Sequence, residues 1–228
     1  MLFQPVPQDI RDPLILLMIK LENISHSLNG KQLFDKLSTE IPAGGRLLIS
    51  GESGSGKTTL LRMLLGFVRP DQGKIFIDGE ELRLDNVWRL RRKMAYVSQE
   101  MQIGRGQVEN FIREILRFKH NRHIEYQKEQ VLKLLDDFQL SHDTIGKDLE
   151  DLSGGELQRV AIIVTLLLDR PIYLLDEVTS ALDQPMKELI VDYFTGLTDK
   201  TLIVSSHDKI WHDQQLPTLH TGNNGSSS

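Results

Sequence analysis

A glycine-rich segment has the residue types and the spacing that bind phosphate groups. Residues 51–58 read Gly-Glu-Ser-Gly-Ser-Gly-Lys-Thr, which fits the pattern G-x-x-x-x-G-K-[ST]. Glycines let backbone N–H groups approach phosphate oxygens closely, Lys57 supplies a positive charge, and the Thr58 hydroxyl is a suitable oxygen ligand for Mg²⁺. The pattern therefore predicts a nucleotide site with Mg²⁺. The residues expected to contact the nucleotide here are Gly51, Glu52, Ser53, Gly54, Ser55, Gly56, Lys57, Thr58 and Thr59.

This segment falls between a predicted strand and a predicted helix, which is the context that the pattern requires. The strand-like runs are short and apolar: Ile19–Ile24, Arg46–Ser50, Lys74–Ile77, Met94–Ser98, Ile172–Asp176 and Thr201–Ser205. Helical periodicity marks segments between several of them: Thr58–Gly66, Glu156–Leu168 and Pro185–Phe194. Strands that alternate with helices predict an α/β protein with a mostly parallel sheet.

The middle of the chain departs from this alternation. Gln107–Phe118 and Ile124–Phe138 are consecutive helical patterns with no strand between them. We therefore expect a helical insertion at about residues 100–152.

Two adjacent carboxylates follow the buried run Ile172–Leu175. Parallel strands deliver the residues at their ends to the C-terminal edge of the sheet, where ligands bind in open α/β sheets. Asp176 is expected to bind Mg²⁺ through a hard oxygen. Glu177, one residue further, is placed to polarise a water molecule toward the γ-phosphate. Beside a phosphate-binding segment, we interpret this pair as functional rather than as an exposed turn.

An ordered series of motifs resembles the ATP-binding-cassette (ABC) ATPases over residues 18–207. Besides the phosphate loop and Gln99, the motifs are Leu-Ser-Gly-Gly-Glu-Leu-Gln-Arg at 152–159, Ile-Tyr-Leu-Leu-Asp-Glu at 172–177, Ser-Ala-Leu-Asp at 180–183 and Val-Ser-Ser-His at 204–207. The resemblance implies a P-loop NTPase fold with an ABC-type core, an N-terminal antiparallel β portion and a helical insertion. It also implies ATP and Mg²⁺ as cofactors.

The resemblance gives catalytic roles to three residues. Gln99 is expected to contact Mg²⁺ or the attacking water. His207 is expected to bond the γ-phosphate and to hold Glu177 and the water in line. With Glu177 as the general base, the expected reaction is hydrolysis of ATP by in-line attack of water.

The resemblance also implies a second subunit. Ser153, Gly154 and Gly155 open the predicted helix that follows them, and a helix N-terminus attracts anions. In this family that turn faces the γ-phosphate bound by the other subunit, and Asp183 is expected at the same interface. The ATP-bound form is thus expected to be a head-to-tail homodimer.

Two positions depart from the family pattern. Leu28 stands where an aromatic residue usually stacks on adenine, so base affinity is expected to be weaker unless Phe34 compensates. Glu156 stands where glutamine is commoner, which is a familiar variant.

Composition limits the classes of protein. The chain has 228 residues, of which 39% are hydrophobic and 26% charged, as in globular proteins. The net charge of −5 disfavours general nucleic-acid binding, and the basic stretch Arg89–Lys93 is interpreted as a solvated face. The absence of cysteine excludes disulfides, thiolate nucleophiles and cysteine-bound metals.

The leading interpretation is the ATPase subunit of a membrane transporter, similar to compact bacterial export-type ATPases. We expect one domain over residues 18–220, a poorly ordered leader at 1–17 and a flexible tail at 221–228. The apolar run Pro13–Ile19 is shorter than the roughly 20 residues that span a membrane. A separate transmembrane permease is therefore expected, docked at Gln99–Arg122, with this chain peripheral on the cytoplasmic face of the inner membrane.

Two other classes differ from this one in their partners. A soluble cassette ATPase without a transport role, for example in iron–sulfur cluster assembly, has the same motifs. A DNA-repair or ribosome-associated cassette ATPase is disfavoured, because this sequence has neither long coiled-coil segments nor a second cassette. The transported substrate is chosen by the permease, so this sequence does not identify it.

Overall fold

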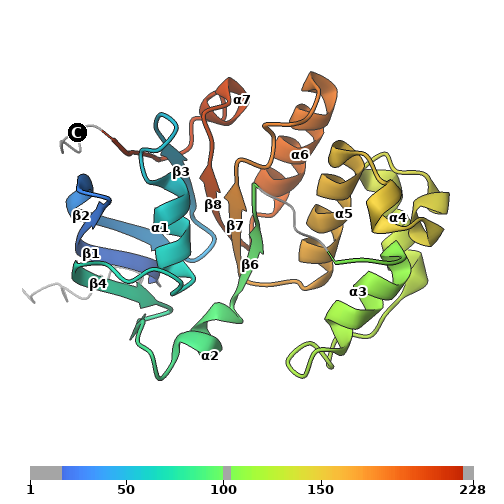
Figure 1. Ribbon diagram of the computed structural model, residues 1–228, viewed down its shortest axis with the longest axis horizontal. Coiled ribbons are helices and arrows are strands. Elements are labelled where there is room, and N and C mark those ends of the chain that lie inside the picture. Colours follow the sequence, from blue (N-terminus) through green and yellow to red (C-terminus); the bar gives the residue numbers. More distant parts are fainter. Residues whose placement is uncertain (1–16, 100–103, 223–228) are drawn as a thin grey trace, which may run out of the picture.

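The computed structural model describes residues 17–99 and 104–222, which form two sheets with surrounding helices (Figure 1). The antiparallel sheet has the order β2-β1-β4-β5, with β1 (Leu17–Leu28), β2 (Lys31–Pro42), β4 (Gln72–Ile77) and β5 (Glu80–Glu81). The parallel sheet has the order β6-β7-β8-β3-β9, with β3 (Arg46–Ser50), β6 (Met94–Val97), β7 (Ile172–Asp176), β8 (Thr201–Ser205) and β9 (Thr218–His220). The predicted α/β class is confirmed, including its N-terminal antiparallel portion.

The central strands of the parallel sheet are buried on both faces. In β7, Tyr173 and Leu175 join the core on one side of the sheet, and Ile172 and Leu174 join the core on the other side. A strand covered on both faces appears in the sequence as a continuous apolar run. The predicted bounds of β3, β7 and β8 are therefore confirmed.

Helices cover the two faces of the parallel sheet (Figure 1). On one face, α1 (Lys57–Leu64) packs between this sheet and the antiparallel sheet. On the other face lie α5 (Gly154–Leu167) and α6 (Gln184–Gly196). Two short helices, α2 (Val87–Arg91) and α7 (Lys209–His212), flank β6 and β8.

The predicted helical insertion is present beside α5. It contains α3 (Val108–Arg117), α4 (Lys128–Asp137) and two 3₁₀ helices, η1 (His142–Gly146) and η2 (Leu149–Asp151). Its apolar side chains join the same core as α5 and α6. Residues 100–103, where the insertion was expected to begin, lie outside the described residues.

Several elements differ from the local predictions, and three of them show why. Helix α4 begins at Lys128 rather than Ile124. Strand β2 was not predicted, because it lies at a sheet edge with a mostly exposed, polar sequence. Strand β9 was not predicted either, since three residues are too few to show a periodicity.

Both ends of the domain differ slightly from their predicted positions. Strand β1 begins at Leu17, and the rest of the predicted leader lies outside the described residues. Thr221, placed in the flexible tail by the sequence, is instead 7% exposed and hydrogen-bonded to Ser50 and Ser55. Among residues 17–99 and 104–222, no helix is long and apolar enough to cross a membrane.

Candidate functional site

The phosphate loop connects β3 to α1 and borders a cavity of about 430 Å³. Gly54 and Gly56 have φ angles of 73° and 104°, a left-handed region that favours glycine. The cavity wall joins segments that are far apart in the sequence: Leu28, Asn29, Lys31, Leu33, Ser53, Gly54, Gly56, Lys57, Thr58, Thr59, Gln99, Glu177 and His207. Ten of the predicted site residues are therefore brought together here.

The segment after β9 packs against the phosphate loop. The Ser55 and Thr221 hydroxyls are 2.7 Å apart, and Ser55 is buried. A Cβ atom at Gly51 would approach the Thr221 carbonyl oxygen to 2.5 Å, so no larger residue fits there without movement. Gly51 and Ser55 thus shape the loop and do not line the cavity, and Glu52 is exposed beside them.

The Lys57 ammonium group is buried at the floor of the cavity, where it has three oxygen partners. It donates to the Gly51 and Glu52 carbonyl oxygens at 2.8 and 3.3 Å. It also lies 3.2 Å from the Glu177 carboxylate, and both side chains are less than 10% exposed. A phosphate group that enters the cavity would meet this charge directly.

Thr58 and Asp176 converge beside the cavity, as the predicted Mg²⁺ site requires. The Thr58 hydroxyl donates to Asp176 Oδ1 at 3.1 Å. Tyr96 donates to Oδ2 at 3.0 Å, and Ser205 donates to Oδ1. Burial, and then the charge of Asp176, raise the pKa of Tyr96 well above its usual range, so its hydroxyl stays a donor.

These oxygens fit a hard divalent cation such as Mg²⁺. Among the described residues there is no group of three or more His, Cys, Asp or Glu side chains that could hold a metal. Mg²⁺ typically uses one or two carboxylates and completes its shell with water and substrate phosphates. Gln99 lines the adjoining cavity with Thr58 and Asp176, so its amide oxygen is also available there.

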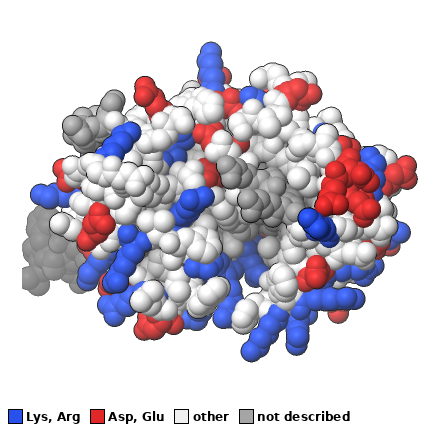
Figure 2. All heavy atoms as spheres, in the orientation of Figure 1, with Lys and Arg blue, Asp and Glu red and all other residues white. Residues whose placement is uncertain are grey.

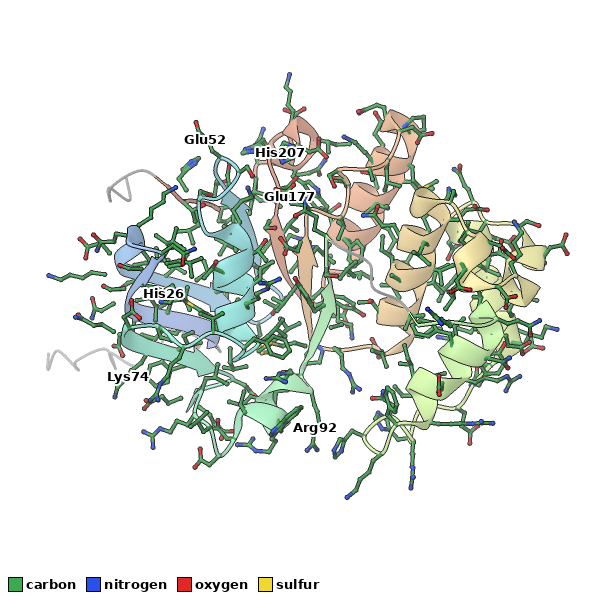
Figure 3. The ribbon with its side chains drawn as sticks, viewed as in Figure 1. His26, Glu52, Lys74, Arg92, Glu177 and His207 are labelled. Atoms are coloured by element: carbon green, nitrogen blue, oxygen red, sulfur yellow. The ribbon has the colours of Figure 1, made fainter. Side chains whose placement is uncertain are left out.

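Glu177 lines the cavity near His207 (Figure 3), and its Oε2 is buried without a hydrogen bond. Its backbone has a φ of 51°, and its N–H donates to the Ser205 carbonyl oxygen at 2.9 Å. Oε2 lies 3.0 Å from His207 Nδ1, which is an ion-pair distance, but it accepts no hydrogen bond. A buried carboxylate oxygen without a donor is a ready acceptor for the proton of a water molecule.

A partly buried network joins the loop after Glu177 to the segment around His207. Asp208 accepts from the Thr179 hydroxyl at 2.6 Å and from the Lys187 ammonium at 2.9 Å. The Trp211 indole N–H donates to the same Thr179 hydroxyl at 3.3 Å. Burial alone would raise the pKa of Asp208, but these two hydrogen bonds lower it below its ordinary value. Asp208 is therefore held as a carboxylate directly after His207.

The second predicted anion site lies on α5, away from this cavity. Ser153 caps the helix in a capping box with Glu156, whose carboxylate accepts from the Ser153 N–H at 2.9 Å. Asp183 caps α6 and accepts from the Met186 N–H at 3.1 Å. Ser153, Gly154, Gly155 and Asp183 do not line the phosphate-loop cavity of the same protomer.

Of the two residues expected near the adenine base, Leu28 and Phe34, the prediction for Phe34 is wrong. Leu28 is 49% exposed and lines the cavity, as expected. Phe34 is 5% exposed and packs under the loop, where a Cβ at Gly56 would come within 2.9 Å of its ring. Phe34 therefore cannot stack on a base in place of the missing aromatic residue.

Several site residues were missed by sequence reasoning. Ser205 pairs with Asp176 in the parallel register of β7 and β8, so the strand order would have revealed it. Tyr96 lies on β6, next to β7, and could have been found in the same way. Lys31 and Thr221 come from segments with no recognisable motif, and Lys31 donates to the Gly54 carbonyl oxygen at 3.2 Å.

Comparison with known proteins identifies related sequences and structures. The ABC transporter family model matches residues 34–180. The choline transport ATP-binding protein OpuBA of Bacillus subtilis is 31% identical over 84% of this chain and 51% of its own length. An ATP-dependent lipid A-core flippase of Haemophilus influenzae is 32% identical over 83% of this chain and 33% of its own length. This chain thus spans about half or less of these curated relatives.

Solved structures show the same arrangement of elements. The dimeric structure of the bacterial ABC transporter cassette MJ0796 has a TM-score of 0.77 and 28% identity, and the match covers 90% of this chain and 94% of that one. A dimeric post-hydrolysis state of that cassette, bound to ADP and Pi, has the same TM-score of 0.77 with 27% identity and the same coverage of 90% and 94%.

Proposed function

This chain belongs to the ABC transporter family, and we propose that it binds ATP with Mg²⁺ and hydrolyses it to drive a separate transmembrane permease. One observation carries the proposal: a phosphate loop, a buried lysine and a glutamate with an unsatisfied oxygen line one cavity, and the Thr58–Asp176 pair lines the cavity beside it. That set provides a phosphate cradle, oxygen ligands for a cation and a base for water.

In the proposed mechanism, this chain acts mainly by positioning and electrostatics. The loop N–H groups and Lys57 bind the β- and γ-phosphates. Thr58, Asp176 and Gln99 would hold Mg²⁺, which neutralises phosphate charge when bound. Glu177 accepts the proton of the attacking water, and His207 and Gln99 orient it.

ATP binding is expected to separate Lys57 from Glu177. Without nucleotide, the lysine neutralises the glutamate at 3.2 Å. Phosphate oxygens compete for the same ammonium group, because they bring more negative charge to it. Glu177 is then released to act as a base only when ATP is present.

The phosphate loop and the Ser153 turn are separate predicted anion sites within one protomer, and this separation suggests the quaternary state. Ser153 and Asp183 do not reach the phosphate loop of their own protomer, and both are exposed helix caps. We propose that they face the γ-phosphate of the partner subunit in a head-to-tail homodimer. The dimeric relatives support this proposal.

In this mechanism Asp208 positions His207, and a substitution of Asp208 tests that role. The two carboxylate oxygens of Asp208 accept hydrogen bonds from Thr179 and Lys187. Asp208→Asn removes the negative charge and one of these two acceptors, so His207 should shift relative to Glu177. A misplacement of about 1 Å can cost up to 10²-fold in rate, and we expect kcat to fall about tenfold with little change in KM for ATP. Steady-state ATPase kinetics measure both parameters.

The matched control is Asp192→Asn, because Asp192 is exposed on α6. It should keep the wild-type kcat. If Asp208→Asn instead raises KM and leaves kcat unchanged, Asp208 supports binding and does not position His207.

The transport role is tested by isolating the partner. A tagged Glu177→Gln chain would be expressed in its native host and purified from membranes in mild detergent, with and without ATP. We expect a multi-span membrane protein to co-purify in stoichiometric amount. A partner from the soluble fraction, with nothing recovered from membranes, would reject the permease and favour an assembly-type cassette ATPase.

A further inference from the structure

A cationic surface with exposed aromatic side chains lies at the N-terminal edge of the parallel sheet, below α2 and α3. Figure 2 shows Lys and Arg side chains gathered along this lower edge of the molecule. We call this surface the basic edge, and its members are Arg92, Arg117, Lys119, Arg122, Arg170, Trp88 and Phe118.

The register of the sheet brings the first part of the basic edge together. Met94 pairs with Ile172 in the parallel ladder of β6 and β7, and the Ile172 N–H donates to the Lys93 carbonyl oxygen at 3.1 Å. Arg92 and Arg170 each precede this pair by two residues. They are therefore neighbours at the start of adjacent strands, and Figure 3 shows Arg92 just after α2.

A buried asparagine fixes the loop after α3 against these strands. Asn121 is 8% exposed, and its amide donates to the Ile115 carbonyl oxygen at 2.8 Å. The Arg170 guanidinium donates to the Asn121 side-chain oxygen. Lys119 and Arg122, which are exposed on either side of Asn121, are thus held beside Arg170.

The positive charge of the basic edge is not neutralised within the described part of the chain. Arg92, Arg117, Lys119 and Arg122 form no ion pair there, whereas Arg89 and Lys93 on the same side pair with Glu80 and Asp78. Asp169, next to Arg170, is engaged by Lys200 at 2.7 Å.

The pKa of His120 is lowered by the same excess of cations. Partial desolvation and then the charge of Arg92 lower the pKa of His120, and Lys119 and Arg170 add to the effect. His120 is therefore pushed toward its neutral form by the surface around it.

Aromatic side chains are exposed among these charges. Trp88 is 69% exposed and Phe118 is 61% exposed. The Arg91 guanidinium lies over two exposed rings, 4.6 Å from the Trp88 ring centre and 4.1 Å from the Phe67 ring centre. Exposed Trp and Phe among clustered Lys and Arg are typical of surfaces that enter the headgroup region of a bilayer.

We propose that the basic edge binds the surface of a membrane that contains anionic phospholipids. The partner is a bilayer, because the exposed aromatic rings gain from apolar contact that a free phosphate does not offer. The basic edge lies at the opposite end of β6 and β7 from the phosphate loop, so ATP and membrane can be bound together. This contact goes beyond the proposed function, since it requires neither a permease nor ATP. Arg117, Lys119 and Arg122 also lie within Gln99–Arg122, the segment expected to dock the permease, so the test uses vesicles that contain no permease.

The test uses the full chain and vesicles of phosphatidylcholine with or without about one third phosphatidylglycerol. We expect binding only to the anionic vesicles, weakened by salt. Each Lys or Arg near such a surface contributes roughly a fivefold factor, so the triple variant Arg92→Gln, Lys119→Gln, Arg122→Gln should bind about a hundredfold more weakly. Trp88 fluorescence should shift to the blue on binding, while Trp211 is buried and should not respond.

The matched control removes the same charge elsewhere: Lys36→Gln, Lys128→Gln, Lys133→Gln, three exposed residues outside the basic edge. It should bind like the wild type, and both triple variants should keep the wild-type unfolding temperature. Equal losses in the two triple variants, or equal binding to neutral vesicles, would overturn the proposal. Binding to duplex DNA through the same residues, without binding to vesicles, would replace it with a nucleic-acid surface. The permease capture with Glu177→Gln is a separate readout, so failure of one proposal leaves the other distinguishable.

Discussion

Glu177→Gln is expected to lower the steady-state rate of ATP hydrolysis by about 10²–10³-fold. The amide keeps the shape of the side chain and its place in the cavity, but it cannot accept a proton from water. ATP should still bind, since Lys57 and the phosphate loop are intact. The variant should therefore accumulate as an ATP-bound dimer, visible by size-exclusion chromatography coupled to light scattering.

The control for this prediction is Glu114→Gln, which changes an exposed glutamate on α3. It should hydrolyse ATP at the wild-type rate and remain monomeric at the same nucleotide concentration. Wild-type turnover by Glu177→Gln would contradict the role of Glu177 as the base. Slow turnover without a dimer would keep that role but reject the head-to-tail arrangement.

Lys57→Met is expected to abolish ATP binding and also to destabilise the protein itself. Lys57 and Glu177 form an ion pair in which both side chains are less than 10% exposed. Removing one partner of a buried pair leaves a charge without compensation, which typically costs about 3–5 kcal/mol. His207, at 3.0 Å from Glu177, compensates only when it is protonated. Chemical denaturation of the nucleotide-free protein measures the loss in the free energy of unfolding.

The double variant Lys57→Met, Glu177→Gln separates stability from function. Both charges are removed, so most of the free energy of unfolding should be recovered. ATP binding and hydrolysis should stay absent, because the phosphate-binding lysine is still missing. If Lys57→Met alone unfolds at the wild-type denaturant concentration, the pair contributes nothing to stability, and the proposed competition between phosphate and Glu177 for Lys57 loses its basis.

The core strands could be predicted from the sequence because burial on both faces leaves an unbroken apolar run. The predicted bounds of β3, β7 and β8 match the structure for this reason. Strand β2 could not be recognised, since its burial pattern is mostly exposed and its register against β1 contains several irregularities. The start of α4 was misplaced because Ile124 and Tyr126 are apolar residues of a loop that packs on the same core.

The site could be predicted where its residues are contiguous in the sequence. The phosphate loop follows β3 directly, Asp176 is the last residue of β7 and Glu177 follows it, so local order is enough to locate them. Tyr96, Ser205 and Thr221 reach the site through the order of the strands, which no single segment of sequence specifies. Phe34 illustrates the opposite case, since an aromatic residue near Leu28 suggested a base-stacking role, but its side chain is buried in the core beneath the loop.

The place of β3 in the sheet has a consequence for how the protein is made. Strand β3 is hydrogen-bonded on one side to β8 and on the other to β9, and Ser55 contacts Thr221, 166 residues later in the chain. When β3 and α1 have emerged from the ribosome, β8 and β9, the two neighbours of β3, have not yet been synthesised. Contacts of such long sequence separation form late and slow folding. The nucleotide-binding loop, although encoded in the first quarter of the chain, should thus be among the last features to acquire its native shape, and nascent chains that stop before β9 should expose an unpaired strand edge to chaperones and proteases.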